Sequence, residues 1–427
     1  MHQWPGRFDL FREALDVKPV AELGNLVRDS TSGTSETGWY GRAMRRLVLL
    51  LSTIVALDIT FFTALTPLLP HFAAQFDLSK TGAGILFAAY GAGVLAASIP
   101  GGVAASRVGP RQTALVGVAL TASASFVFAF GDQAWLVGAA RFAQGVGSAF
   151  SWAGSLAWLV AVAPRERRAT LIGTTMGAAV IGALGGPALG AVATVAGVKA
   201  TFAAVGALGF ALSLRIVATP GVPAHAQPLS ALRRMDAVLA GAAWLLVLPA
   251  LLFGVLDVLA PLKLHHHGWS GVAIGALFLA AAAVEAVLNP LLGRLTDLRG
   301  ALVPVRYALL ASGALSIALA WTGSAVALAA LVVAAGIAYG GFYTPGMALI
   351  SIRAEQRDIA PGLVFGVMNG AWAAGNVVGP AAGGALAQLA GDSLPYLLLA
   401  ALCLLTLLGT ARAMPRYLQA RSRPSSS

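Results

Sequence analysis

Charged residues are scarce in this chain, and that scarcity excludes most soluble proteins. Asp, Glu, Lys and Arg make up 11% of the 427 residues, whereas hydrophobic residues make up 58%. A soluble domain carries about 25% charged residues, so this chain has too few of them to cover a water-exposed surface. The composition therefore predicts a protein that lies in a lipid bilayer.

Cysteine is nearly absent, and histidine is absent from the interior of the apolar stretches. The single cysteine, Cys403, excludes an internal disulfide, a cluster of thiolate metal ligands and a redox pair. None of the six histidines lies deep in an apolar stretch, and the sequence has no H-E-x-x-H motif and no phosphate-binding P-loop. We therefore predict neither an enzyme nor an ATP-driven pump, and no cofactor or metal site.

Long apolar stretches are abundant. A helix that crosses the hydrocarbon core of a bilayer needs about 20 mostly apolar residues. Twelve stretches meet this length, so the predicted fold is an all-α membrane protein with 12 transmembrane helices. They lie near residues 47–70, 82–104, 112–131, 134–160, 170–196, 199–218, 238–262, 271–293, 304–322, 325–350, 362–390 and 394–412.

The basic residues between these stretches predict how the chain crosses the membrane. With the amino terminus inside, 24 of the 28 Lys and Arg residues fall in inside segments and 3 in outside segments. Cytoplasmic loops carry such an excess of positive charge. We therefore expect both termini in the cytoplasm of a multi-pass plasma (inner) membrane protein. The net charge of +11 then reflects the membrane and not a nucleic-acid partner.

The sequence also divides into two related halves. The glycine-rich stretch at 182–190 has a counterpart at 375–384, and each lies in the fifth predicted helix of its half. Paired halves with a site between them are typical of secondary transporters, so we expect two pseudo-symmetric six-helix bundles. The predicted parts are a disordered cytoplasmic tail at 1–43, a bundle at 44–218, a cytoplasmic linker at 219–237, a bundle at 238–415 and a disordered tail at 416–427.

The loop after the second apolar stretch carries a glycine and arginine pattern. Its residues Gly102, Arg107, Gly109 and Arg111 resemble the signature loop of the major facilitator superfamily. Glycine permits a tight turn, and arginine can dock against the carbonyl ends of helices. The resemblance implies a latch between conformations, and Asp297 keeps the acidic residue in the second-half copy.

Two further motifs are similar to ones in that family. Arg141, Gln144 and Gly145 resemble its helix-4 motif, which implies coupling of proton movement to transport. The alternative is a structural arginine that hydrogen-bonds backbone carbonyls of neighbouring helices. In helix 5, the residues that resemble the antiporter motif are expected to let this helix approach a helix of the other half. They are Gly182, Gly186, Pro187 and Gly190.

Helix 1 contains a buried carboxylate. Asp58, Pro67 and Pro70 resemble the helix-1 pattern of drug/proton antiporters and vesicular amine transporters. A carboxylate within the membrane is costly and marks a functional site by default, and the resemblance implies a proton carrier. The alternative is a static ion pair between Asp58 and Arg141.

Other embedded side chains are candidates for a substrate site. Glu285 is the best second carboxylate for proton coupling, with a plain inter-helix hydrogen bond as the alternative, whereas Asp257 is expected to face the outer vestibule. A mainly apolar pocket with a few polar groups suits an amphiphilic substrate, although each wall residue could equally serve packing. The candidate wall comprises Phe61, Phe62, Gln144, Trp152, Asn289, Tyr339, Tyr343, Asn369, Trp372 and Asn376.

Together these features predict a secondary active transporter that works by alternating access. The leading hypothesis is proton-coupled efflux, or antiport, of small amphiphilic or drug-like molecules. The alternative is a proton symporter or a uniporter for a sugar or an organic acid. The expected partners are a small-molecule substrate, protons and the lipid bilayer, and the chain is expected to act as a monomer.

Overall fold

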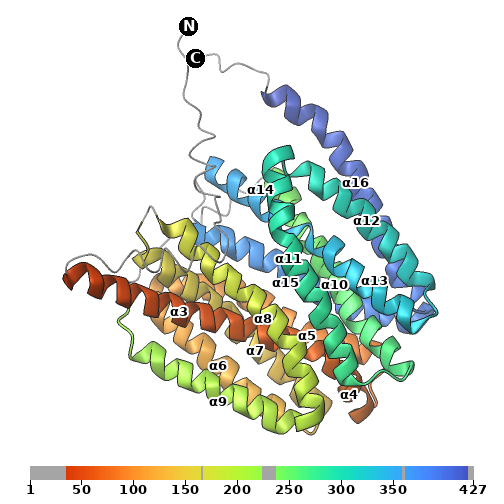
Figure 1. The fold of residues 1–427 in the computed structure, drawn as a ribbon, viewed down its shortest axis with the longest axis horizontal. Coiled ribbons are helices and arrows are strands. Elements are labelled where there is room, and N and C mark those ends of the chain that lie inside the picture. Colours follow the sequence, from red (N-terminus) through yellow and green to blue (C-terminus); the bar gives the residue numbers. More distant parts are fainter. Residues whose placement is uncertain (1–34, 165–166, 224–236, 358–360, 422–427) are drawn as a thin grey trace.

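The computed structural model describes residues 35–164, 167–223, 237–357 and 361–421, and every regular element in these ranges is a helix. The helices form two bundles that Figure 1 shows side by side. The N-terminal bundle contains α3 (Ser35–Thr63), α4 (Leu65–Gln75), α5 (Lys80–Arg107), α6 (Pro110–Phe130), α7 (Ala134–Val162), α8 (Arg168–Ala196) and α9 (Val198–Val217). The C-terminal bundle contains α10 (Ala237–His266), α11 (Gly271–Arg299), α12 (Leu302–Trp321), α13 (Ala325–Gly340), α14 (Tyr343–Gln356), α15 (Pro361–Ala390) and α16 (Ser393–Arg421).

The helices follow the predicted spans closely, with two spans divided. The first predicted span is α3 and α4, which are interrupted at Ala64, and the tenth is α13 and α14, which are interrupted at Gly341. At both ends of the chain a helix reaches into a segment predicted to be a disordered tail, since α3 begins at Ser35 and α16 ends at Arg421. Residues 1–34, 224–236 and 422–427, which hold most of the predicted tails and linker, lie outside the described residues.

Eleven spans in the described part of the chain are long and apolar enough to cross a membrane. The eleventh predicted span, α15, has 30 residues but is not among them. Its apolar character is diluted by glycines and by Asn369 and Asn376. Because α15 packs between α5 and α10, part of its surface faces protein and not lipid.

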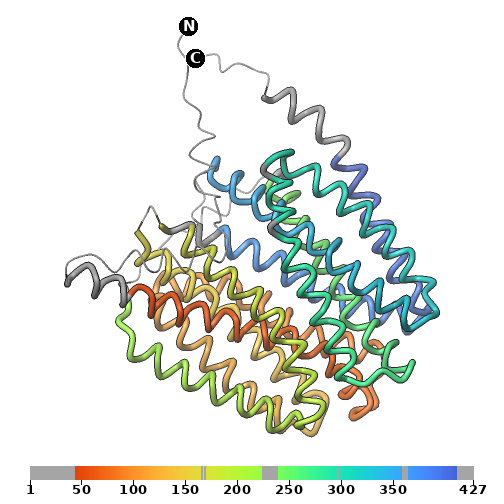
Figure 2. The backbone as a smooth tube through the Cα atoms, in the orientation of Figure 1, coloured from red at the N-terminus to blue at the C-terminus, as the bar shows by residue number. Residues whose placement is uncertain are grey.

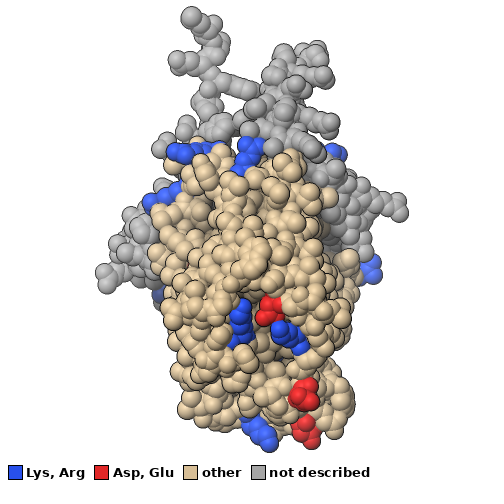
Figure 3. All heavy atoms as spheres, turned by 90° about the vertical axis from the view of Figure 1, so that its right-hand side faces the viewer, with Lys and Arg blue, Asp and Glu red and all other residues tan. Residues whose placement is uncertain are grey.

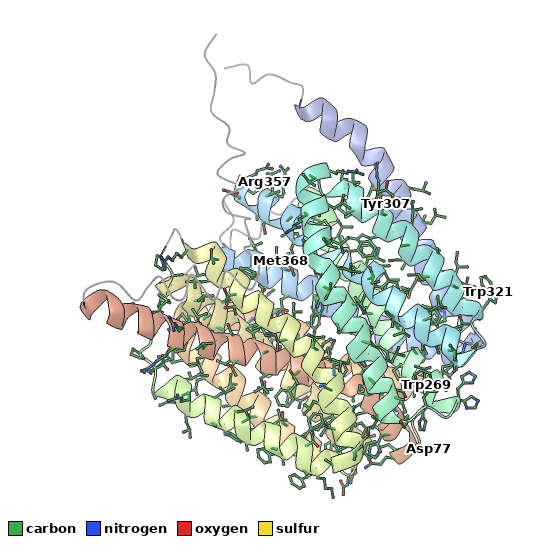
Figure 4. All side chains as sticks on the ribbon, in the orientation of Figure 1. Asp77, Trp269, Tyr307, Trp321, Arg357 and Met368 are labelled. Carbon is green, nitrogen blue, oxygen red and sulfur yellow. The ribbon has the colours of Figure 1, made fainter. Side chains whose placement is uncertain are left out.

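The two ends of the molecule differ in charge and in packing. We define the basic end as the one where Arg111 meets the end of α9 and Arg306 meets Thr410 of α16. The opposite end carries Lys80 and Asp392. Figure 4 labels Arg357 toward the former and Asp77 with Trp269 toward the latter. Between the ends, most of the face in Figure 3 is uncharged, as expected for a surface in lipid.

Contacts between the bundles are concentrated at the opposite end. There Lys80 forms an ion pair with Asp392 at 2.5 Å, and Gln388 accepts a hydrogen bond from the Thr81 backbone at 3.1 Å. The largest hydrophobic cluster contains residues of both bundles, whereas the clusters nearest the basic end each belong to one bundle. The bundles therefore join at the opposite end and diverge toward the basic end, as the backbone in Figure 2 shows.

Candidate functional site

The interruption between α3 and α4 shapes the centre of the N-terminal bundle. Pro67 has no backbone N–H and clashes with the preceding helical turn, so the α-helix breaks at Ala64. The break leaves carbonyl groups of the last turn of α3 open to other donors. In a bilayer such groups need partners within the protein.

Arg141 of α7 supplies those partners. Its guanidinium donates to the Phe61 carbonyl at 2.8 Å, to the Phe62 carbonyl at 3.2 Å and to the Gln144 side chain at 3.1 Å. The side chain is fully buried and lies 4.8 Å from the centroid of the Tyr90 ring. The sequence alternative of an arginine bonded to backbone carbonyls is therefore what the structure shows.

Asp58 has a different set of partners. One carboxylate oxygen, Oδ2, accepts from Ser148 Oγ at 2.7 Å, from Trp152 Nε1 at 2.7 Å and from the Tyr90 hydroxyl at 3.2 Å. All three donors are neutral, and among the described residues no ion pair joins Asp58 to Arg141. The static ion pair that the sequence left open is wrong for this conformation, because Arg141 is engaged by the carbonyls of α3. The two charges still lie near enough to interact.

The C-terminal bundle holds a second acidic group. Glu285 of α11 lies beside Asn289, one turn further along the same helix. Gly340 of α13 makes room for the Glu285 carboxylate, since a Cβ at this position would overlap it. Asp257 of α10 is near enough for its charge to interact with that of Glu285, and both interact with Tyr343 of α14. Asp257 is partly exposed and belongs to this acidic group, while its position at the outer vestibule stays a prediction.

Aromatic side chains connect the two acidic regions across the bundle interface. Phe62 of α3 lies 5.2 Å from the Tyr90 ring and 5.0 Å, edge to face, from Trp372 of α15. The Trp372 indole is within reach of the Tyr343 hydroxyl. Phe253 of α10 then stacks on Tyr343, with ring centroids 6.4 Å apart and planes inclined by 7°. A continuous aromatic path thus runs from the donors of Asp58 to the neighbours of Glu285.

The other candidate wall residues lie in varied positions. Gln144 donates to Ser125 inside the N-terminal bundle, and Tyr339 bonds Ser316 inside the C-terminal bundle. Phe61 packs against Phe202 of α9, away from the interface. These three side chains are buried within single bundles, so they support the bundle cores and do not line the path between them.

Two polar candidates on α15 remain. Asn376 donates to the Trp372 carbonyl at 3.0 Å, and its backbone lies against Gly91 of α5. Asn376 therefore lies at the bundle interface, where it supports the position of Trp372. Asn369 is half-buried two turns earlier on the same helix, and it does not belong to either acidic group as the described residues define them.

The glycine motif of helix 5 packs differently from the prediction. Gly182, Gly186 and Gly190 face α3 and α4 of their own bundle, where a Cβ would overlap Ala56, Thr63 or Ala64. The expectation that these glycines meet the other half is wrong. A different face of α8 makes that contact, through Pro187 and Ala191 against Gly275 of α11 and through Thr194 against Gly271.

The second-half copy of this motif repeats the arrangement. Gly375, Gly379 and Gly383 of α15 lie against α10, whereas Pro380 and Gly384 meet α5. The sequence repeat therefore corresponds to a spatial one. In each bundle the fifth helix packs on the first helix of its own bundle by its glycine face and on the other bundle by its proline face.

The signature loop lies at the basic end. Arg111 donates to the carbonyls of Thr219 at 3.2 Å and Val217 at 3.5 Å, so it docks on the carboxyl end of α9 as expected. Gly109 has φ +115°, a conformation that favours glycine. Arg107 ends α5, and Gly102 has open space around its Cα. The side chain of Asp297 lies outside the described part of the structure.

Sequence reasoning missed two ligands of Asp58. Tyr90 had no motif around it, and its role depends on the crossing of α5 and α7, where Gly145 lies directly against the Tyr90 backbone. Ser148 had a usable signal, since Arg141, Ser148 and Trp152 share one face of a helix by their i, i+7 and i+11 spacing.

Comparison with known proteins identifies the family. The model of the Major Facilitator Superfamily matches residues 50–363 and 237–427, so the chain belongs to this superfamily of membrane transporters. It is a secondary transporter by fold, and the prediction that it is not an enzyme is confirmed.

Two curated relatives match part of the chain. It is 33% identical over 163 residues to a vesicular acetylcholine transporter of Drosophila melanogaster, and 31% identical over 134 residues to a synaptic vesicular amine transporter of Homo sapiens. These matches cover 37% and 31% of the chain but only 27% and 26% of the relatives' lengths.

Solved structures confirm the fold over most of the chain. A bacterial homolog of the human lysosomal transporter Spinster, in an inward-facing and unoccupied conformation, aligns with TM-score 0.73 and 16% identity over 90% of this chain and 99% of that one. A nucleoside transporter aligns with TM-score 0.67 and 13% identity over 86% of this chain and 99% of the other. At these identities the likeness concerns the fold alone.

Proposed function

We propose that this protein is a proton-coupled antiporter that exports small amphiphilic, drug-like organic cations by alternating access. One observation carries the proposal. Asp58 is a buried carboxylate held by three neutral donors, with no arginine or lysine bonded to it among the described residues. A buried charge normally needs a partner of opposite sign, so the site is suited to bind either a proton or a cationic substrate.

The second acidic group supports the choice of a cationic substrate. Asp257 and Glu285 lie at the far side of the aromatic path that begins at Phe62. Carboxylates combined with aromatic faces are the groups that recognise an organic ammonium ion. The names of the two curated relatives, an acetylcholine and an amine transporter, refer to cations of this kind.

In the proposed cycle, proton and substrate use Asp58 in turn. With the basic end in the cytoplasm, as the distribution of Lys and Arg favours, the structure corresponds to a conformation closed at the outside. A cytoplasmic cation then displaces the proton of Asp58, the bundles rock, and an external proton displaces the cation. A one-to-one exchange can sustain a substrate ratio of about ten for each pH unit across the membrane.

A flux assay tests the proposal. The purified protein is reconstituted into vesicles with an imposed pH gradient, and the fluorescent cation ethidium is the probe. We expect ethidium uptake against its gradient with proton movement in the opposite direction. Asp58→Asn should abolish both, whereas Asp132→Asn, at an exposed position, should leave both unchanged. Unchanged transport by the Asp58→Asn variant, or proton movement in the same direction as the probe, would reject antiport at this site.

A further inference from the structure

Asp58 lines a small cavity, and its second carboxylate oxygen, Oδ1, is buried without a hydrogen-bond partner among the described residues. The cavity lies within the N-terminal bundle, between α3, α6, α7 and α9, and among the described residues none of the C-terminal bundle lines it. Its volume is about 10 Å³ as the space open to the centre of a water molecule. The lining residues are Ile54, Leu57, Asp58, Phe61, Val118, Thr121, Ala122, Ser151 and Gly209.

Two polar atoms in this lining have no hydrogen-bond partner among the described residues. They are Asp58 Oδ1 and Thr121 Oγ1, and both are buried. The third polar side chain, Ser151, already donates its hydroxyl hydrogen to the Ser148 carbonyl at 2.9 Å. The remaining side chains are apolar, and neither of the two atoms is bonded to Ser151, so the lining leaves both without a protein partner.

Physical chemistry favours a bound water molecule at this place. Buried polar groups are almost always hydrogen-bonded, to protein or to ordered water. A water molecule needs a polar cavity with at least about 10 Å³ of space for its centre and two or more polar partners. The cavity meets both conditions, because Asp58 Oδ1 can accept from the water and the Thr121 hydroxyl can either donate to it or accept from it.

We propose that this cavity binds a water molecule between Asp58 Oδ1 and Thr121 Oγ1, and that this water exchanges the proton of Asp58. The proposal rests on the proposed function, which makes Asp58 the proton carrier. Thr121 is then a positioning residue that holds the water. The water accepts the proton of Oδ1 while it passes one of its own protons on toward solvent, and the reverse transfer protonates Oδ1 again. The substrate approaches the Oδ2 side, where Trp152 is only half-buried.

The charged neighbours of Asp58 agree with the assignment of Oδ1 to the proton and Oδ2 to the substrate. The charged and titratable groups that face its carboxylate are Tyr90 of α5 and Arg141 of α7, and Tyr90 donates to Oδ2, not Oδ1. Apart from Asp58 itself, the lining of the cavity therefore contains no charged group in the described part of the chain. Two further buried atoms have no partner among the described residues, and both lie along α7 toward the basic end. They are Ser155 Oγ and Trp158 Nε1, so additional water molecules would find polar partners on that side of the cavity.

The experiment compares Thr121→Val, which keeps the side-chain shape without the hydroxyl, with Thr121→Ser, which keeps the hydroxyl. Thr113→Val is the matched control, since Thr113 lies buried on the same helix but donates to the Gly109 carbonyl. In reconstituted vesicles, proton release on addition of ethidium is measured beside ethidium counterflow without a pH gradient. We expect Thr121→Val to slow proton release about tenfold, the loss of one water-mediated hydrogen bond, and to leave counterflow unchanged.

The Thr121→Ser and Thr113→Val variants should match the native protein in both assays. The proposal is overturned if Thr121→Val releases protons at the native rate while Asp58→Asn still abolishes coupling, or if it slows counterflow equally, which indicates a purely structural role. If instead the Asp58→Asn variant transports normally, the proposed proton-coupled antiport at Asp58 is rejected, and the water proposal is rejected with it. A structure of the native protein at a resolution that shows water should contain density between the two oxygens, and a dry cavity refutes the proposal even if the Thr121→Val variant does not fold.

Discussion

Replacement of Arg141 by lysine separates the charge of this residue from its geometry. Both side chains are cationic, but only arginine has the planar fork that can donate to two carbonyls at once. In the structure that fork bonds the Phe61 carbonyl at 2.8 Å and the Phe62 carbonyl at 3.2 Å. We therefore expect Arg141→Lys to destabilise the protein and to impair transport although the net charge is unchanged.

The magnitude follows from the bonds that lysine cannot make. A hydrogen bond from a charged donor contributes about 1.5–3 kcal/mol, and a buried acceptor left without a partner costs about 1–3 kcal/mol. Lysine can retain one carbonyl, so the loss of the other predicts a net cost of about 3 kcal/mol. This corresponds to a folding equilibrium weaker by a factor of roughly 150.

The single cysteine provides the assay. Cys403 is buried in the same hydrophobic cluster as Phe61, so a thiol-reactive dye should report unfolding of the shared core. We expect the Arg141→Lys variant to expose Cys403 at a clearly lower temperature than the native protein. Arg215→Lys, at an exposed position, is the control and should show no shift. If the Arg141→Lys variant kept both the native unfolding temperature and native transport, the reasoning would be refuted, because a positive charge at this position would then be sufficient without the forked geometry of arginine.

Two further predictions concern packing and closure. Gly186→Ala should destabilise the protein by about 1–3 kcal/mol through overlap with Thr63, whereas Gly173→Ala on the same helix, with open space around it, should be neutral or slightly stabilising in the same dye assay. Asp392→Ala should weaken closure of the opposite end by less than about 1 kcal/mol, since the Lys80 side chain is 41% exposed to solvent. Spin labels across the two bundles should then show a modest shift toward separation, and the charge swap of the pair should restore the native distance distribution; an unchanged distribution in Asp392→Ala would contradict a role in closure.

The pattern of the glycine motif shows where sequence reasoning succeeds and where it stops. The spacing of glycines alone showed that residues 375–384 repeat residues 182–190, and the structure places both copies at equivalent helix contacts. The sequence did not predict which neighbouring helix each face contacts. A helix has several faces, and the choice between α3 and α11 depends on how all the other helices are arranged around it.

The centre of the site shows the same division. The position of Asp58 in an apolar helix already marked it as functional, because an unpaired charge in lipid is costly. Its ligands were not predictable with the same certainty, since Tyr90, Ser148 and Trp152 come from helices whose rotation is fixed only by packing. The sequence also allowed an ion pair with Arg141, and that was decided by the break at Ala64, which freed carbonyls for the guanidinium.

Composition and spacing by themselves determined that the chain is an all-helical membrane protein with two related halves, because the lipid interior permits few other solutions for long apolar stretches. They also determined which helix carries the buried acid. Tertiary structure alone decided that one oxygen of Asp58 is bonded by three neutral donors while the other has no partner among the described residues. It also decided that Asp257 belongs with Glu285. Those facts depend on side chains from separate helices meeting in three dimensions, and no local pattern in the chain specifies such a meeting.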